Sequence, residues 1–205
     1  LRTAIGKFNG ALKGFQAHDL GKDVITNILK QSNVKPEFID EVIMGQVLTG
    51  GVGQNSARQA AMRAGIPKEK TGYLINQVCG SGLRAIVAGY QSILLNDVKI
   101  VIAGGQESMS NSSEEMMMKD GLIDAYNDYH MGITAENVAE KWNISRKDQD
   151  EFAFSSQLKA QEAIKNKKFK AEIINSLLLH DEHPRKGVTL ESLSKLNPAF
   201  KKNGT

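Results

Sequence analysis

The only cysteine of the chain, Cys79, stands in the stretch INQVCGSGLRAIVAG (75–89) and is followed by glycines at 80 and 82. A cysteine thiolate is a strong nucleophile that attacks activated carbonyl groups. A strand-like run ends just before Cys79 and a helical pattern begins just after it. The thiol would therefore lie at a helix N-terminus, where free N–H groups and the helix dipole favour the thiolate. The alternative is a buried packing residue, the more usual role of a free cysteine.

The glycines around Cys79 favour the nucleophile. Gly80 and Gly82 would keep side chains away from the thiol, so that a substrate carbonyl could approach the backbone closely. Backbone N–H groups at such a turn are also suited to stabilise an oxyanion. These features favour a nucleophilic role for Cys79 and leave the buried packing role open.

Helices and strands alternate over the first half of the chain. The expected order is a helix over 17–34, a strand over 39–48, a helix over 50–65, a strand over 71–78, a helix over 81–96 and a strand over 98–108. Asp19 is the expected N-cap of the first helix. The helix over 81–96 carries apolar residues on most of its sides, which predicts that it is buried. The pattern indicates an α/β fold with a mixed, mostly parallel sheet covered by helices, and ligands bind at the carboxyl ends of such strands.

The pattern changes after Met109. Short and long helices are expected over 131–142 and 144–169, the second opened by a capping box between Ser145 and Asp148. The stretch 180–205 is polar and is expected to be irregular. We therefore divide the chain into an α/β domain over 1–108 and a helical and irregular loop domain over 109–205.

Composition excludes several classes of protein. The 205 residues are 40% hydrophobic and 24% charged, with a net charge of +3, which is typical of a soluble protein and does not indicate a nucleic-acid partner. A single cysteine excludes an internal disulfide. No apolar run approaches the ~18 residues of a membrane span, and no signal peptide is visible, so we expect no membrane partner and a cytoplasmic location.

Three other motifs have weaker functional interpretations. HDEH (180–183) lacks a further ligand cluster, and we expect no metal site. KNKKFK (165–170) is interpreted as a solvated helix end, with steering of a phosphate as the alternative. GGVGQNS (50–56) differs from a dinucleotide-binding fingerprint because Ser56 replaces the third glycine.

The residues around Cys79 resemble the active-cysteine signature of thiolases, the acyl-CoA C-acyltransferases, and the acetoacetyl-CoA thiolase branch looks most similar. Other stretches resemble the same family in the same order. They are RTAIGKFNGAL (2–12), GQNSARQAA (53–61), AGGQESMS (103–110), YHMGITAENVAEKWNISRKDQDEFA (129–153) and DEHPRKGVTLESLSKLNPAF (181–200). The resemblance covers nearly the whole chain.

This resemblance implies an enzyme that forms or cleaves acetoacetyl-CoA by Claisen chemistry through an acetyl-cysteine at Cys79. It implies acetyl-CoA and acetoacetyl-CoA as substrates, no further cofactor, and a homo-oligomer, either a dimer or a homotetramer. By the same resemblance, the CoA moiety would contact Leu122, His130, Met131, Arg185, Ser192 and Phe200. Arg185 also suits a phosphate on chemical grounds, with a solvated surface arginine as the alternative. His130 has a structural role as its alternative.

Several features of the thiolase pattern are missing from the sequence. Thiolases use a second cysteine as the base, a histidine in a GHP motif and an asparagine in a NEAF-like motif, and none of these occurs here. Their second α/β half is absent, and the first domain is expected to be incomplete at its N-terminus. The segments SSEEM and INSLLLH are shorter than their thiolase counterparts. A non-catalytic CoA-binding or oligomerisation fragment is therefore the alternative, and the isolated chain should expose apolar surface where the second half would pack.

Overall fold

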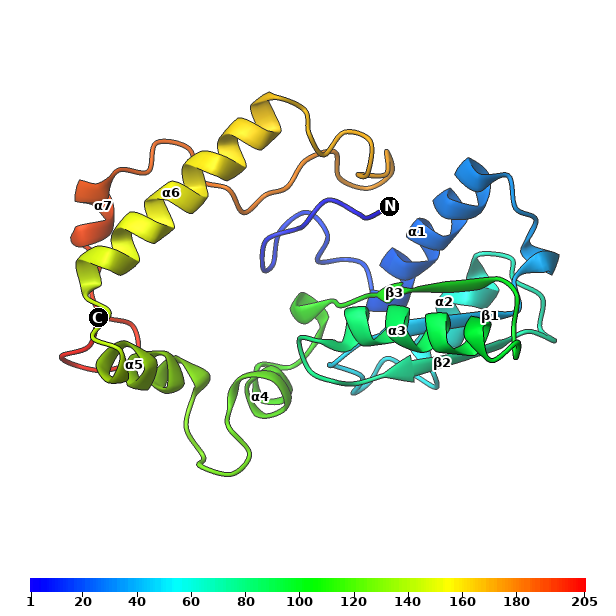
Figure 1. Cartoon of the computed structure of the whole chain (residues 1–205), viewed down its shortest axis with the longest axis horizontal. Coiled ribbons are helices and arrows are strands. Elements are labelled where there is room, and N and C mark those ends of the chain that lie inside the picture. The colour runs from blue at the N-terminus through cyan, green and yellow to red at the C-terminus, as the bar shows by residue number, and fades with distance from the viewer. The chain divides into compact units, whose positions relative to one another are not determined.

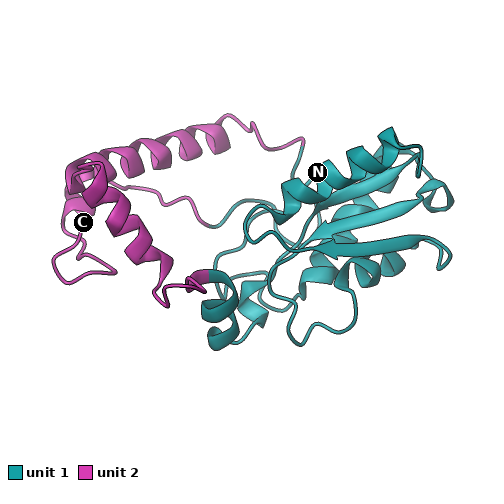
Figure 2. Ribbon diagram, turned by 60° about the horizontal axis from the view of Figure 1, so that its bottom comes forward, with its two compact units in different colours: residues 1–121, 172–182 teal, residues 122–171, 183–205 magenta.

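The computed structural model describes all 205 residues, which form two compact units. Unit 1 comprises residues 1–121 and 172–182, and unit 2 comprises residues 122–171 and 183–205 (Figure 2). The sequence predicts a boundary after residue 108, whereas unit 1 continues to Gly121 and takes in a second segment near residue 180. No helix in either unit has the length and apolar character that crossing a membrane requires.

Unit 1 contains the expected alternation of helices and strands (Figure 1). Its elements are α1 (Ala17–Ser32), a 3-10 turn (Pro36–Phe38), β1 (Glu41–Gly45), α2 (Ser56–Arg63), β2 (Thr71–Ile75), α3 (Ser81–Leu94), β3 (Val101–Gly105), a second 3-10 turn (Met109–Asn111) and α4 (Glu114–Met117). The strands are parallel in the order β2-β1-β3. Gly45 of β1 pairs with Ile75 and Gly105, so all three strands end at one edge of the sheet. The α/β class and the parallel sheet are thus confirmed.

The two faces of the sheet are covered by different helices (Figure 1). Val42 and Met44 of β1 are buried in one core with Ile25 and Leu29 of α1 and the alanines of α2. Successive side chains of a strand point to opposite faces, so Ile43, which is fully buried, faces α3 on the other side. The central strand is therefore covered on both faces, as its continuous apolar sequence predicts.

Helix α3 is buried along one side only, which corrects the prediction of a fully buried helix. Its buried residues are Ser81, Ala85 and Gly89, four apart along the helix, so a stripe of small residues packs on the sheet. The large apolar residues of α3 lie on its outer side, and Leu83 is 70% and Tyr90 62% exposed. The three-stranded sheet covers a single side of α3, and no other element of unit 1 covers the opposite side.

The N-cap of α1 also differs from the prediction. Gln16 is the N-cap, and Asp19 is the third helical residue, whose carboxylate accepts a hydrogen bond from the Gln16 N–H at 3.1 Å. The helix therefore begins at Ala17, two residues before Asp19, which completes the capping box instead of opening the helix.

Unit 2 is helical and irregular, as the sequence predicts. A π-helical turn (Met118–Leu122) ends where unit 2 begins, and α5 (Met131–Lys141), α6 (Arg146–Lys165) and α7 (Leu190–Ser194) follow. The capping box of Ser145 and Asp148 at the start of α6 is confirmed. Helix α7 adds a short helical turn to a segment that was otherwise correctly expected to be irregular.

Two acidic residues hold the N-terminal segment of unit 1 to the end of its second segment. The Arg2 guanidinium donates two hydrogen bonds to the Asp181 carboxylate, at 2.7 and 3.0 Å, and the Ile5 N–H donates a third at 2.8 Å. The Glu182 carboxylate accepts from the N–H groups of Lys7 and Ala11. The Arg2 hydrogen bonds hold the pKa of Asp181 below its usual value, although burial opposes this shift. The contacts explain why this segment belongs to unit 1.

These contacts make the stability of unit 1 depend on pH. Because the pKa of Asp181 is lower in the folded chain than in the unfolded chain, its contribution is present above the unfolded value of ~3.9 and is lost as the pH falls through the folded value. Asp181→Asn should lower the free energy of unfolding by about 2 kcal/mol at pH 7, and the difference from the unmodified chain should shrink toward pH 3. Urea unfolding across this pH range measures it, with exposed Glu69→Gln as the control. A deficit that is equally large at pH 3 and pH 7 would contradict this account.

Candidate functional site

Cys79 is exposed and lies in the turn between β2 and α3. Strand β2 ends at Ile75, at the carboxyl edge of the sheet, and α3 begins at Ser81. The predicted strand-to-helix position of Cys79 is therefore confirmed, and the alternative of a buried packing residue is wrong. The first N–H groups of a helix lack acceptors within the helix, so the start of α3 places positive dipole charge beside the thiol.

The turn that carries Cys79 is tightly hydrogen-bonded. The N–H of Gln77 donates to the Ser81 hydroxyl at 2.8 Å, and the N–H of Val78 donates to the Asn76 side chain at 2.9 Å. The N–H groups of Gly80 and Ser81 donate to the carbonyls of Gln77 and Val78. These four N–H groups already donate hydrogen bonds within the turn, so they are not free to stabilise an oxyanion. The prediction that N–H groups of the turn do so therefore applies only to other N–H groups. The N–H of Cys79 itself is not among these four, and further donors without an acceptor belong to the first turn of α3.

Glycines at the ends of β1 and β3 allow the start of α3 to pack closely on the sheet. A Cβ added to Gly45, the last residue of β1, would lie less than 3.0 Å from the backbone of Ser81 and Gly82. A Cβ on Gly105, the last residue of β3, would lie 3.3 Å from the Gly82 Cα. Gly45 and Gly105 therefore allow close backbone packing between helix and sheet, whereas a Cβ on Gly82 itself would make only ordinary contacts, at 3.6 Å or more. The sequence shows Gly82 beside Cys79 but gives no sign that Gly45 and Gly105 belong to the same site.

Buried polar side chains connect the loops at the same edge of the sheet. Gln46 and Gln106 directly follow Gly45 and Gly105, and both are bonded to the buried Ser56 hydroxyl at the start of α2. The Gln106 amide also donates to the Gln46 carbonyl oxygen at 3.0 Å. This network fixes the ends of β1 and β3 relative to α2, so it supports the sheet edge on which α3 is seated.

Glu107 is a partly buried group that sequence reasoning also missed. Its carboxylate accepts from the N–H groups of Val47 and Leu48, at 2.9 and 3.2 Å. Burial raises the pKa of Glu107 above its usual value, and the backbone hydrogen bonds oppose that shift. Glu107 joins the loop after β1 to the loop after β3, and its place in AGGQES was the only sequence signal for it.

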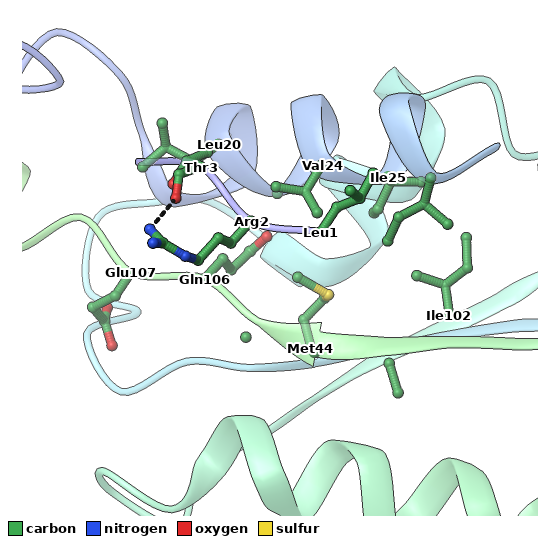
Figure 3. A pocket seen from close by; sticks show the side chains of 15 residues that line it. Leu1, Arg2, Thr3, Leu20, Val24, Ile25, Met44, Ile102, Gln106 and Glu107 are labelled. Atoms are coloured by element: carbon green, nitrogen blue, oxygen red, sulfur yellow. Dashed lines mark hydrogen bonds between the residues drawn. The ribbon is translucent and has the colours of Figure 1, made fainter. Parts of the chain in front are cut away.

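A hollow of about 200 Å³ lies between α1 and β3. Figure 3 shows polar side chains of Arg2, Gln106 and Glu107 toward one end of it and apolar side chains such as Val24 and Ile102 toward the other. Cys79 is not among its lining residues. The hollow is therefore separate from the nucleophile.

In unit 2, four of the predicted CoA contacts lie close together: Leu122, His130, Met131 and Phe200. A short loop places Ile123, next to Leu122, opposite His130, and His130 caps α5, whose first residue is Met131. The His130 ring stacks on Phe200 with the ring centroids 5.0 Å apart. A Cβ on Gly132 would overlap the Phe200 ring, so the aromatic ring lies against the α5 backbone.

The His130 side chain has a defined orientation. Its Nδ1 accepts a hydrogen bond from the Gly132 N–H at 2.9 Å, so in the neutral ring the proton is on Nε2. His130 therefore has the structural role of an N-cap and still presents a donor at Nε2. These two roles are compatible, and the structural alternative does not replace the predicted one.

Arg185 and Ser192 lie in another part of unit 2, along α6 and α7. The backbone of Arg185 is held by Gln157 and Gln161 of α6, while its exposed guanidinium makes no ion pair. The Ser192 hydroxyl accepts from the Thr189 N–H at 3.0 Å and donates to the Thr189 carbonyl. Arg185 is thus placed to receive an anion, whereas Ser192 is occupied in capping α7.

The HDEH stretch does not gather ligands for a metal ion. Asp181 and Glu182 bind Arg2 and the N-terminal backbone, as described above. No group of three or more histidine, cysteine, aspartate or glutamate side chains is arranged to hold a metal. The two carboxylates therefore have a structural explanation.

An exposed cysteine at the carboxyl edge of a parallel sheet, beside a helix N-terminus, is an arrangement suited to a thiol nucleophile in an α/β fold. Comparison with known proteins specifies the family. The model of the thiolase N-terminal domain matches residues 1–117 and 112–205, so the chain belongs to the thiolase family.

Several relatives are named acetyl-CoA acetyltransferase. The chain is 48% identical to an acetyl-CoA acetyltransferase of Rhizobium meliloti, with all of the chain and 58% of the relative covered, and 48% identical to one of Cupriavidus necator, of which 59% is covered. It also resembles the crystal structure of the Bacillus anthracis acetyl-CoA acetyltransferase, with a TM-score of 0.91, 35% identity, and coverage of 100% of this chain and 58% of that one. The chain spans less than two thirds of their length. The match to the Rhizobium protein extends over 229 positions against 205 residues here, as the shorter internal segments predict.

The glycine contacts under α3 yield a stability prediction. Gly45→Ala should lower the free energy of unfolding by about 3 kcal/mol, because the new methyl group must displace the start of α3. Gly104→Ala is the matched control, since a Cβ at this neighbouring strand glycine meets nothing within 4 Å, and it should change stability by less than about 0.5 kcal/mol. Urea unfolding measures both variants. Equal effects at the two positions would show that close packing on Gly45 is unimportant.

Proposed function

We propose that the chain forms the acyl-accepting half of an acetyl-CoA acetyltransferase, in which Cys79 takes the acetyl group from a CoA thioester. The observation that carries this proposal is the exposed Cys79 at the strand-to-helix turn, within a chain that matches the thiolase N-terminal domain over its whole length. The relatives named acetyl-CoA acetyltransferase support acetyl-CoA as the donor.

The proposed step is a simple acyl exchange. The Cys79 thiolate attacks the thioester carbonyl carbon, and a new S–C bond forms while the S–C bond to CoA breaks. CoA leaves as a thiolate and takes up a proton. The oxyanion of the tetrahedral intermediate needs N–H donors, which the first turn of α3 is suited to provide. No cofactor other than the CoA thioester is required.

We further propose that unit 2 binds the CoA moiety. The Arg185 guanidinium would pair with phosphate, because it is exposed and has no carboxylate partner. Leu122, His130, Met131 and Phe200 would form a partly apolar wall for the pantetheine arm, with the His130 Nε2–H as a donor. Ser192 would contact the CoA moiety at the start of α7, which it helps to cap.

Condensation of two acetyl groups needs more than these residues. A base must remove a proton from the α-carbon of the second acetyl group, and donors must stabilise the enolate. The 205 residues contain no second cysteine for the first task. We propose that the whole protein makes or cleaves acetoacetyl-CoA, as a cytoplasmic homo-oligomer. The alternative, a non-catalytic CoA-binding or oligomerisation fragment, would have the same fold without turnover.

The exposed apolar side of α3 supports a second half in the working enzyme. Leu83, Ile86, Tyr90 and Leu94 are all more than half exposed on this one helix. Apolar surface of this kind is normally covered by a protein partner. The same helix would then be buried on all sides in the complete protein.

The proposed acyl exchange predicts a covalent product. Incubation with acetyl-CoA should add one acetyl group to the peptide that contains Cys79, and Cys79→Ala should remove the modification, because no other thiol is present. Intact-mass and peptide mass spectrometry measure the product. Acetylation that persists in Cys79→Ala, or none on the unmodified chain, would contradict the assignment of Cys79.

The proposed CoA site predicts which variants weaken binding. Arg185→Ala should raise the dissociation constant for CoA about 10-fold or more, because a charged hydrogen bond is worth about 1.5–3 kcal/mol. The adjacent exposed Lys186→Ala is the matched control and should have little effect. Isothermal titration calorimetry measures the constants.

One further variant tests His130 in the same titration. His130→Asn keeps a side chain suited to cap α5 but removes the ring, so weaker CoA binding by this variant would report the ring itself. Unchanged affinity in both Arg185→Ala and His130→Asn would refute the site.

A further inference from the structure

Val78, the residue before Cys79, has an unusual backbone conformation. Its φ is 47°, in the left-handed region, which is sterically unfavourable for a β-branched residue. Apart from Lys167, the other non-glycine residues with positive φ are asparagine or aspartate, which tolerate this region: Asn9, Asn33, Asn55, Asn96, Asp128 and Asn143. Val78 is therefore the one β-branched residue that the fold holds in this conformation.

Side chains on both sides of Val78 hold it there. Its N–H donates to the Asn76 side-chain oxygen at 2.9 Å, and its carbonyl accepts from the Ser81 hydroxyl at 2.6 Å. The same hydroxyl accepts from the Gln77 N–H at 2.8 Å. Ser81 is only 4% exposed, so its hydroxyl is fixed in place. One buried hydroxyl thus joins the Asn76–Gln77 and Val78–Cys79 peptide groups, on the two sides of Val78.

The Ser81 hydroxyl does not serve as an ordinary helix cap. The N-cap of α3 is Gly80, which has no side chain, and no side chain caps the helix. The hydroxyl is bonded to residues that come before the helix, so its hydrogen bonds stabilise the turn. The contacts of the Ser81 hydroxyl therefore indicate that it stabilises the turn before α3.

We propose that Ser81 is a positioning residue for Cys79, which it directs by holding Val78 in the left-handed conformation. This proposal rests on Cys79 being the acylated residue of the proposed function. Without the hydroxyl, Val78 would relax toward a favourable φ, and the peptide between Val78 and Cys79 would rotate. The thiol would then lose its alignment with the N–H donors at the start of α3, while it would still be exposed to solvent.

The test compares an alignment-dependent reaction with one that needs only an exposed thiol. In the first, the thiolate attacks 4-nitrophenyl acetate, the S–C bond to the acetyl group forms, and 4-nitrophenolate leaves. In the second, iodoacetamide alkylates the same thiol with loss of iodide. Ser81→Ala should slow acetylation roughly 10- to 100-fold, as expected for a misplaced reacting group, and should slow alkylation less than about threefold.

Rescue distinguishes positioning from general loosening of the fold. Glycine adopts a positive φ without a steric penalty, so adding Val78→Gly to Ser81→Ala should restore most of the acetylation rate. Ser92→Ala is the matched control on the same helix, because that hydroxyl bonds only to the Ala88 carbonyl, and it should leave both rates unchanged. An NMR spectrum should show a strong intraresidue Hα–HN contact for Val78 in the unmodified chain that is lost in Ser81→Ala.

Two results would overturn the proposal: an unchanged acetylation rate in Ser81→Ala, or the same low rate with and without the glycine at position 78. If Ser81→Ala alone does not fold, Asn76→Ala removes the other hydrogen bond to Val78 from an exposed side chain and should also slow acetylation. Reaction with acetyl-CoA is measured separately. Failure of that reaction alone would contradict the proposed function and leave the positioning role of Ser81 supported by the ester reaction.

Discussion

The structure of the candidate site depends on the close contact between the start of α3 and the carboxyl edge of the sheet. The Gly45 backbone meets the Ser81–Gly82 backbone with no room for a side chain, and a Cβ on Gly105 would lie a tight 3.3 Å from the Gly82 Cα. Because β1 and β3 end in register, both glycines reach the helix at the same level. The position of Cys79 is thus set by backbone packing against the most buried strand of the unit, and a thiol on a flexible loop would lack this precision.

Helix α3 has two sides with opposite requirements. The side on the sheet uses serine, alanine and glycine, because only small residues allow such close packing. The outer side carries large apolar residues that this chain leaves exposed. A helix that was needed only to cover the sheet would have polar residues on its outer side. The helix that positions the nucleophile therefore also supplies the apolar surface that the proposed second half would cover.

The sequence was sufficient for those features that depend on local patterns. The alternation of helices and parallel strands, the turn at Cys79 and the capping box at Ser145 all arise from residues close together in the chain. The features that it did not reveal join distant segments. The contact of Gly45 with Gly82 and the binding of Arg2 by Asp181 are examples. A glycine can occur in a strand for several structural reasons. Only the three-dimensional structure shows that another backbone segment packs against Gly45.

Apolar periodicity also misled the prediction in one place, because it reports what a sequence is suited to bury. For α3 it predicted burial on most sides, whereas the chain covers one side only. The amino-acid pattern reflects every surface that a helix is meant to cover, and the structure of this chain includes only some of them. The wrong prediction for α3 is therefore consistent with a chain that spans only part of the length of its relatives.

The conformation of Val78 bears on the choice between an enzyme and a non-catalytic fragment. A left-handed β-branched residue costs free energy, of order 1–3 kcal/mol, and persists only where surrounding contacts enforce it. A fragment that only binds CoA or its own copies would gain stability from a glycine or asparagine at this position. The chain instead holds Val78 with two side chains, directly beside an exposed thiol. Strain of this kind is found at sites where one group must be held in one direction, and this favours a thiol that reacts.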